Sequence, residues 1–335
     1  MVNYKIFFLT ISIFTFIFCF FKFDLISKYL NIFDLPDNKR KIHKKPVPKI
    51  GGIFFFLVFA ISICQIFYFE DYKDADNLNK ILIPCFFFIV GIMDDKYDLS
   101  PNIRLIILTL GLILIIKIFS LPEIELLSIE NYGIVNVKSF SLFFTVLCYL
   151  LFLNAFNMFD GINGLAISLF TIYVLLFLLL FNFQDLILIN FLICCLIFLY
   201  FNIKEKIFLG NSGSYLLSGI ISSSLISQNT DLENSFFAEE IFLILLIPGI
   251  DMLRLFIQRI SKKKHPFNAD KHHLHHILIN NFNIYNVLGI ILGIILLPII
   301  ARFYFETNTI LLIFFSLAIY FFLILKYLPS DYNSK

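Results

Sequence analysis

Long runs of apolar residues alternate with short polar segments along the whole chain. About eleven such runs can be traced, and most approach the ~20 residues that an α-helix needs to cross a bilayer. They lie roughly at 4–22, 51–69, 80–93, 103–120, 140–157, 163–182, 186–203, 213–228, 239–258, 284–304 and 309–327. The pattern predicts an all-α, polytopic membrane protein with about eleven transmembrane helices, and it predicts one integral membrane domain over residues 1–335.

The basic residues indicate how the chain is threaded through the membrane. Most of the 26 Lys and Arg residues fall in alternate polar segments. Because cytoplasmic loops carry the excess of Lys and Arg, we expect the N-terminus outside and the C-terminus in the cytoplasm. The predicted cytoplasmic loops are roughly 24–50, 94–104, 158–164, 203–213 and 258–283. No small-residue cleavage site follows the first apolar run, so we expect an uncleaved span there.

Composition supports a membrane protein and excludes other classes. The chain is 59% hydrophobic and only 15% charged, whereas a soluble domain is about a quarter charged. A net charge of +2 gives no reason to expect a nucleic-acid partner. The six cysteines lie in apolar runs without a C-x-x-C pair, which is typical of reduced, apolar side chains. The 45 Phe residues and the excess of Ile, Asn and Lys look like the bias of an AT-rich genome.

The first cytoplasmic loop is basic and kept out of a helix by two prolines. Asp34 precedes a group of basic residues, Arg40, Lys41 and His43, and the loop ends at a Gly-Gly pair. Such a loop could attract a phosphate or an anionic lipid. It could equally be a positive-inside signal with no further role.

The second loop begins with acids directly after an apolar helix, at Asp94, Asp95 and Asp98, and continues to Arg104. An Asp inside the bilayer costs at least ~2.5 kcal/mol, so these side chains belong at the membrane boundary. Asp94 and Asp98 share a face if the helix continues. Clustered carboxylates repel one another unless a cation joins them, and Mg²⁺ with a phosphate is a common solution. The alternative is a helix end marked by solvated acids.

Polar residues recur at every third position near the end of the fifth run, at Asn154, Asn157 and Asp160. That spacing places them on nearly one face of a helix. Gly161 and Gly164 then break the helix and let a ligand approach the backbone. A simple turn needs glycine but does not need two Asn residues in a membrane helix, so the pattern favours a site.

The eighth run opens with small residues from Gly210 to Ser214. A helix N-terminus of this kind presents N–H groups suited to a phosphate, and an ordinary Ser cap is the alternative.

The last cytoplasmic loop holds five of the six histidines, among Asp251, Arg254, Arg259, Asp270 and Lys271. Zinc binding is one possibility, but the H-H-x-H-H intervals lack cysteine and match no usual zinc pattern. Histidine with Arg and Lys suits a diphosphate better. A solvated His-rich loop is the bland alternative.

In order, spacing and membrane side, these five segments together resemble the polyprenyl-phosphate N-acetylhexosamine-1-phosphate transferases of glycosyltransferase family 4. The resemblance covers roughly residues 34–276, and the H-x-H-H at His273, His275 and His276 is similar to the bacterial branch that uses UDP-GlcNAc and undecaprenyl phosphate. It implies transfer of a sugar 1-phosphate from a UDP-N-acetylhexosamine to undecaprenyl phosphate at the bacterial inner membrane, with Mg²⁺ as cofactor and UMP as product. The resemblance thus implies membrane lipid as a partner, and it leaves open whether the protein forms a homodimer.

The resemblance also implies roles for individual residues. The catalytic acids would be Asp94, Asp95 and Asp160; the substrate-binding residues Asn154, Arg104, Arg259, His273, His275 and His276; and the metal ligands Asn157 and Asn211. An acid would deprotonate the lipid phosphate or act as nucleophile, so one-step and two-step transfer both remain open.

Two positions depart from the family pattern. Asn211 stands at a position where the family usually has Asp, and Asn163 stands at one where it often has Asp. An amide oxygen can ligate Mg²⁺ but brings no charge, so we expect an active enzyme with a higher Mg²⁺ requirement. The alternatives are a phospho-MurNAc-pentapeptide transferase, a transporter of a phosphorylated or lipid-linked solute, and a non-catalytic paralogue that binds lipid phosphate.

Overall fold

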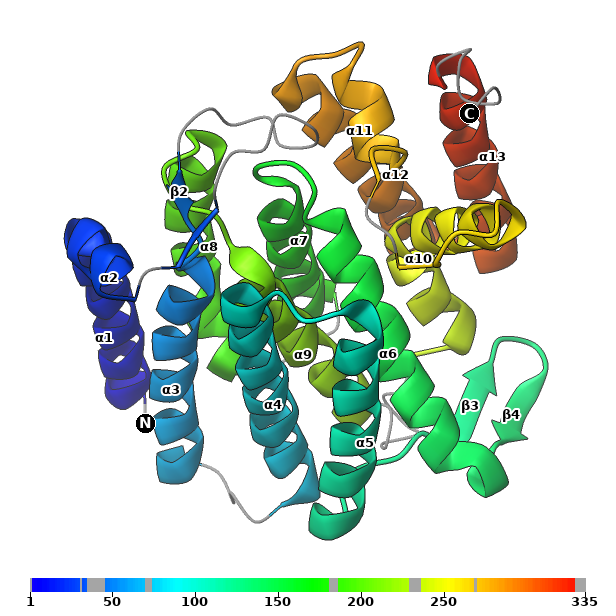
Figure 1. Cartoon of the computed structure of the whole chain (residues 1–335). Helices are drawn as coiled ribbons and strands as arrows, with labels where there is room; N and C mark the ends of the chain where they lie inside the picture. Colours follow the sequence, from blue (N-terminus) through cyan, green and yellow to red (C-terminus); the bar gives the residue numbers. More distant parts are fainter. Residues whose placement is uncertain are drawn as a thin grey trace.

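Each of the apolar runs forms a helix in the computed structural model, which describes residues 2–30, 32–34, 46–69, 74–180, 186–228, 236–267 and 270–328 (Figure 1). The helices are α1 (Val2–Phe21), α2 (Phe23–Leu30), α3 (Gly51–Phe69), α4 (Ala75–Tyr97), α5 (Pro101–Phe119), α6 (Ser141–Phe159), α7 (Leu165–Leu180), α8 (Leu186–Ile203), α9 (Gly210–Gln228), α10 (Ala238–Ser261), α11 (Leu274–Ile279), α12 (Ile284–Phe305) and α13 (Thr309–Tyr327). A single 3₁₀ turn, Lys138–Phe140, precedes α6.

Six of these helices are long and apolar enough to cross a membrane, and α1 with α2 adds a seventh if the pair is one span. The pair is bent by 71° at Lys22. The helices α7 and α8 are apolar but shorter, while α9 is rich in Ser and Gly. The protein is therefore a polytopic helical membrane protein, whereas the count of eleven spans and the orientation remain predictions.

Two short antiparallel hairpins correct the expectation of a purely helical chain. In the first, β1 (Phe33–Asp34) pairs with β2 (Val47–Pro48), and in the second β3 (Leu126–Ile129) pairs with β4 (Gly133–Asn136). Strands of two and four residues are too short to show a recognisable alternation in the sequence. The first hairpin matters for the site, because it fixes Asp34 beside the start of α3.

Helix α9 lies at the centre of the bundle, in contact with α3, α4, α6 and α7. All of its residues from Ser212 to Ser227 are buried. It packs against its neighbours at backbone distance: a methyl group at Gly52 would lie 2.3 Å from the nitrogen of Gly213, and one at Gly91 would lie 2.6 Å from Cα of Ser212. Small residues permit such close approach where the lipid offers no hydrophobic drive for helix association.

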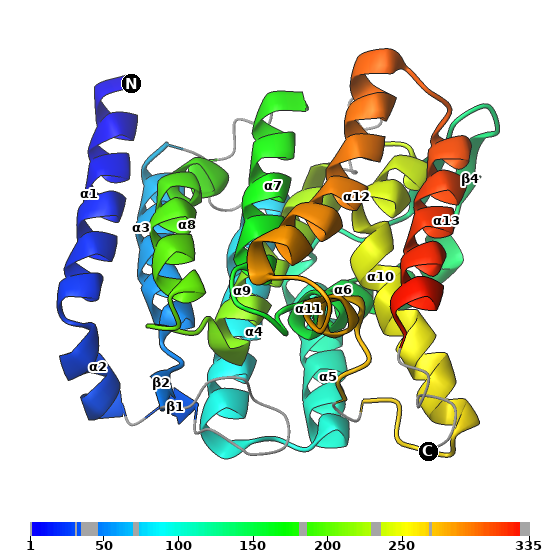
Figure 2. The ribbon, with the colours of Figure 1, turned by 90° about the horizontal axis from the view of Figure 1, so that it is seen from above.

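The peripheral helices lie at opposite edges of this centre (Figure 2). Helix α1 packs on α3 and α8 at one edge, and α13 packs on α10 and α12 at the other. The ends of α4 and α6 and the start of α9 lie between these edges, and their polar side chains are joined by hydrogen bonds.

Candidate active site

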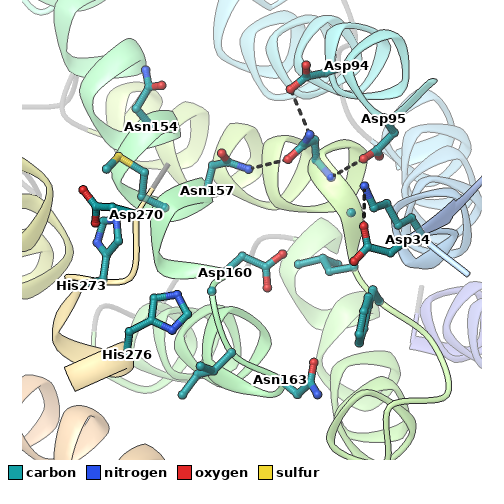
Figure 3. Close-up of a pocket in the computed structure, with 18 of the residues that line it drawn as sticks. Asp34, Asp94, Asp95, Asn154, Asn157, Asp160, Asn163, Asp270, His273 and His276 are labelled. Atoms are coloured by element: carbon teal, nitrogen blue, oxygen red, sulfur yellow. Dashed lines mark hydrogen bonds and ion pairs between the residues drawn. The ribbon is translucent and has the colours of Figure 1, made fainter. Parts of the chain in front are cut away.

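A pocket of about 620 Å³ gathers residues from all five predicted cytoplasmic loops. Those loops therefore lie at one end of the bundle. Every predicted site residue except His275 lines the pocket: Asp94, Asp95, Arg104, Asn154, Asn157, Asp160, Asn211, Arg259, His273 and His276. In Figure 3 the Asp160 carboxylate projects toward the centre, with Asp95 on one side and His276 on the other.

Asp94 is buried at the end of α4 and accepts several hydrogen bonds. Its Oδ1 accepts from the backbone N–H of Leu99 (3.0 Å), and its Oδ2 accepts from the Arg104 guanidinium (3.0 Å) and the Asn211 amide (3.0 Å). The helix ends at Tyr97, and Asp98 takes a left-handed conformation, so Asp94 and Asp98 do not share a helical face. Arg104 thus forms an ion pair with Asp94 and also lines the pocket.

Asp95 is held by the N-terminus of α9. Its two carboxylate oxygens accept from the backbone N–H groups of Asn211 (2.9 Å) and Ser212 (2.8 Å). A carboxylate is stabilised there by the first N–H groups and by the helix dipole. Gly210 has a φ of 76°, and a methyl group on it would lie 2.8 Å from Asp95. The expectation that these N–H groups are available to a phosphate is therefore wrong, because Asp95 already occupies them.

Asn211 joins three elements through its amide. Its Nδ2 donates to Asp94, and its Oδ1 accepts from Nδ2 of Asn157 (3.0 Å), which also donates to Ser214 Oγ (2.8 Å). Asn157 and Asn211, the predicted metal ligands, are therefore hydrogen-bonded to each other through their side-chain amides. Further along α6, Asn154 donates to the carbonyl of Leu150 (2.7 Å).

Asp160 differs from the other two acids. Within the ranges that the structure describes, its carboxylate takes part in no hydrogen bond or ion pair. Burial, and then the nearby charge of Asp95, raise the pKa of the Asp160 carboxyl well above its ordinary value. An acid in this state has a strong tendency to bind a proton or a cation.

No group of three or more His, Cys, Asp or Glu side chains in the described part of the chain has an arrangement that could hold a metal by itself. Mg²⁺, however, is usually bound by one or two carboxylates together with substrate phosphates. Asp160, with Asp95 close behind it, fits that kind of substrate-dependent site.

The opposite wall of the pocket comes from the loop between α10 and α11. Arg259 is buried there, and its guanidinium donates hydrogen bonds to Asp270 (2.8 Å) and to the carbonyl of Pro266 (2.6 Å). Burial opposes ionisation of Asp270, but the hydrogen bonds from Arg259 and the backbone of His272 outweigh it and lower the pKa of this carboxyl. Burial, with the neighbouring His273 and Lys271 side chains, lowers the pKa of His276 to about 4. His276 is therefore a neutral ring at physiological pH.

His275 is the predicted residue that the structure places elsewhere. It is fully buried behind the turn that follows α6 and does not line the pocket. Burial, with its two histidine neighbours, lowers the pKa of His275 well below the usual value. Its predicted contact with substrate is not supported by this position. The spacing of the H-H-x-H-H segment gave no signal that would separate this ring from the others.

The pocket also includes residues that sequence reasoning missed. Lys49 lies beside it and forms an ion pair with Asp34 (3.0 Å). Asn202 accepts from the backbone N–H of Gly164 (2.6 Å) and so ties α8 to the turn after Asp160. Only the position of Lys49 before a Gly-Gly pair could have pointed to it. Of the residues singled out in the first loop, Arg40, Lys41 and His43 lie outside the described residues.

Comparison with known proteins matches this arrangement to one family. The family model described as Glycosyl transferase family 4 matches residues 77–229, which run from α4 to the end of α9. The undecaprenyl-phosphate alpha-N-acetylglucosaminyl 1-phosphate transferase of Thermotoga maritima is 29% identical over 289 residues, covering 84% of this chain and 86% of that protein. The enzyme of the same name from Salmonella typhi is 28% identical over 280 residues, covering 81% and 75%.

A third relative is closer in identity. The probable undecaprenyl-phosphate N-acetylglucosaminyl 1-phosphate transferase of Bacillus subtilis is 32% identical over 262 residues, which are 72% of this chain and 68% of the relative. The similarity therefore extends well beyond the matched central segment and takes in most of both chains. On these grounds the chain belongs to glycosyl transferase family 4.

Proposed function

We propose that this protein transfers N-acetylglucosamine 1-phosphate from UDP-N-acetylglucosamine to undecaprenyl phosphate and releases UMP. The observation that carries the proposal is the composition of the pocket: Asp160, an acid without a hydrogen bond or ion pair in the described part of the chain, faces a wall that contains Arg259, His273 and His276. The names of the relatives supply the substrate class. The reaction would take place at the cytoplasmic face of the bacterial inner membrane, with the C-terminus on the same side.

The chemistry is a displacement at phosphorus. An oxygen of the acceptor phosphate attacks the sugar-bearing phosphorus of the donor, a new P–O bond forms, and the bond to UMP breaks. The second proton of a phosphate monoester has a pKa of about 6, so a base nearby keeps the acceptor fully ionised. Asp160 suits this task, because its raised pKa favours accepting a proton and no hydrogen bond in the described chain competes for it. Its carboxylate is also the group that could act as nucleophile in a two-step transfer.

The two walls of the pocket would divide the substrates. Arg259 and the neutral His276 ring offer donors and a packing surface for the diphosphate and sugar of the donor. Lys49 lies on the Asp34 side, in an ion pair with Asp34, and places a positive charge at this end of the pocket. We assign this side to the acceptor phosphate.

Mg²⁺ belongs to the proposal as well. When bound, it would neutralise the charge of the diphosphate. Asp160 is the residue that would hold it, together with the phosphates of the substrate, and Asp95 would add negative charge from behind.

The test is release of UMP by the purified protein in detergent. UDP-GlcNAc and undecaprenyl phosphate with Mg²⁺ should give UMP and a lipid-linked product, and EDTA should stop both. Parallel reactions with UDP-GalNAc and UDP-MurNAc-pentapeptide separate the branches of the family. UMP released only from the pentapeptide donor would reassign the chain to peptidoglycan synthesis, and binding of lipid phosphate without any UMP release would identify a non-catalytic paralogue.

A further inference from the structure

His275 is buried in a way that substrate binding does not explain. Its side chain has no exposed surface, and neither ring nitrogen has a hydrogen-bond partner in the part of the chain that is described. The ring stacks on His273 with centroids 5.3 Å apart and planes 8° from parallel. It meets the ring of Phe159 edge-on at 6.1 Å. His275 is therefore packed as an aromatic ring between the pocket wall and the end of α6.

The next contact is with the turn that carries Asp160. A methyl group on Gly161 would lie 2.0 Å from Nε2 of His275, far inside contact distance. Gly161 does not have a positive φ, unlike Gly164 with a φ of 85°. The two glycines of this turn are thus required for different reasons. Gly164 is needed for its backbone conformation, and Gly161 is needed because His275 lies against it.

The other end of this stack is fixed by a buried carboxylate in α10. Asp251 accepts from Nδ1 of His273 (2.7 Å), from the backbone N–H of Leu274 (3.1 Å), from Tyr320 (2.8 Å) and from Arg254 (2.9 Å). These bonds tie the start of α11 to α10 and to α13. Because a group in a fully bonded, buried network has little freedom, the ring of His273 has one position, and His275 stacks on a fixed surface.

We propose that Asp251, His273 and His275 form a buried wedge that positions Asp160 by pressing on Gly161. In this wedge His275 and Asp251 are positioning residues, and neither contacts the substrate. The inference deepens the proposed function and rests on it, since it names how the histidine loop sets the geometry of the acid that would act on the acceptor. The wedge also connects the two walls of the pocket, because His275 packs on His273 of one wall and on Gly161 beside Asp160.

A double-mutant cycle between Gly161 and His275 tests the contact. Gly161→Ala should lower turnover about 100-fold, because a displacement near 1 Å at a reacting group has an effect of that size. It should also lower the thermal midpoint in detergent. His275→Ala removes the ring that the new methyl group strikes, so the double variant should regain about tenfold in turnover over Gly161→Ala, and part of the midpoint.

Gly164→Ala is the matched control. It lies in the same turn, but its nearest neighbours are Ile203, Leu199 and Leu288, and its requirement is conformational. His275→Ala should not rescue it. Losses that simply add in the Gly161/His275 pair, or equal rescue of both glycine variants, would overturn the wedge.

A second measurement separates positioning from substrate contact. His275→Ala alone should lower kcat and leave the Kd for UDP-GlcNAc within about threefold of the unmodified protein. Weaker donor binding with kcat retained would assign His275 to the substrate instead. The thermal cycle needs no activity: if the protein releases no UMP but the midpoints are non-additive, the proposed function fails and the wedge stands. If UMP is released and the midpoints add, the reverse holds.

Discussion

The acidic pair at the end of α4 and the acid at the end of α6 face the same pocket but are held in opposite ways. Asp94 and Asp95 accept hydrogen bonds on all four of their carboxylate oxygens from groups on α5, α9 and the α4–α5 connection. Asp160 accepts none within the described chain. Sequence spacing makes the three look like equal members of one acidic cluster.

The difference separates two roles of acids in this protein, one in holding helices together and one in binding a proton, a cation or a phosphate. A buried acid with its donors satisfied stabilises the contact between helices, and removing it leaves those donors unpaired. An acid without donors contributes little to that contact and remains available to a proton, a cation or a phosphate. Substitutions at Asp160, Asp95 and Asn211 test this difference between bonded and unbonded acids.

Asp160→Asn should have the largest effect on activity. It removes the base or nucleophile, and general-base catalysis is worth ~10²–10⁴ in rate, so we expect UMP release to fall by about 1,000-fold. The thermal midpoint should stay the same or rise, because the substitution removes a partly buried carboxylate that has no hydrogen-bond partner in the described chain. Turnover in detergent and a thermal unfolding curve measure the two quantities. Glu125→Gln, at an exposed acid away from the pocket, is the control.

Asp95→Asn should affect stability more than Asp160→Asn does. The amide keeps one acceptor but turns its NH₂ group toward a backbone N–H of α9, and an unsatisfied buried donor costs ~1–3 kcal/mol. We therefore expect a lower midpoint together with a smaller loss of turnover. If Asp95→Asn lowers turnover as far as Asp160→Asn and leaves the midpoint unchanged, the distinction between bonded and free acids is wrong.

Asn211→Asp should have the smallest effect, and its sign depends on Mg²⁺. The new carboxylate would replace an amide that donates to Asp94 at 3.0 Å, so the two acids would repel each other. We expect a lower midpoint in EDTA and recovery when Mg²⁺ binds the pair, since a ligand that binds only the folded state stabilises it. The Mg²⁺ concentration for half-maximal activity should fall about threefold. Equal midpoints with and without Mg²⁺ would show that no cation reaches this position.

The helices were predictable because the runs are apolar, most of them over about the length that a membrane span requires. The runs at 51–69 and 309–327 coincide with α3 and α13. The bend between α1 and α2 and the six-residue α11 were not predicted. Both depend on what packs beside them rather than on the period of their own sequence, and the same holds for the two hairpins.

The residues of the site were predictable for a related reason. A polar side chain at the end of an apolar run costs free energy in the membrane and therefore points to a functional role. Each motif could be recognised separately for this reason, and the pocket contains nearly all of the predicted residues. Their hydrogen bonds were not visible. Whether the Asn211 amide bonds to Asp94 or to a cation depends on how far α4, α6 and α9 are shifted along their axes relative to one another. That shift is set by backbone contacts such as Gly91 against Ser212.

Those close contacts also limit how the sequence can drift. The chain has 45 Phe residues, yet α9 contains none. A mutational bias toward Phe is tolerated on outward-facing positions such as Phe314 and Phe322 of α13, which are more than half exposed. Helix α9 has no such face, and even a methyl group at Gly219 would lie 2.9 Å from Cα of Pro84. Helix α9 is buried from Ser212 to Ser227, so packing limits the size of its side chains, whereas the outer face of α13 accommodates Phe.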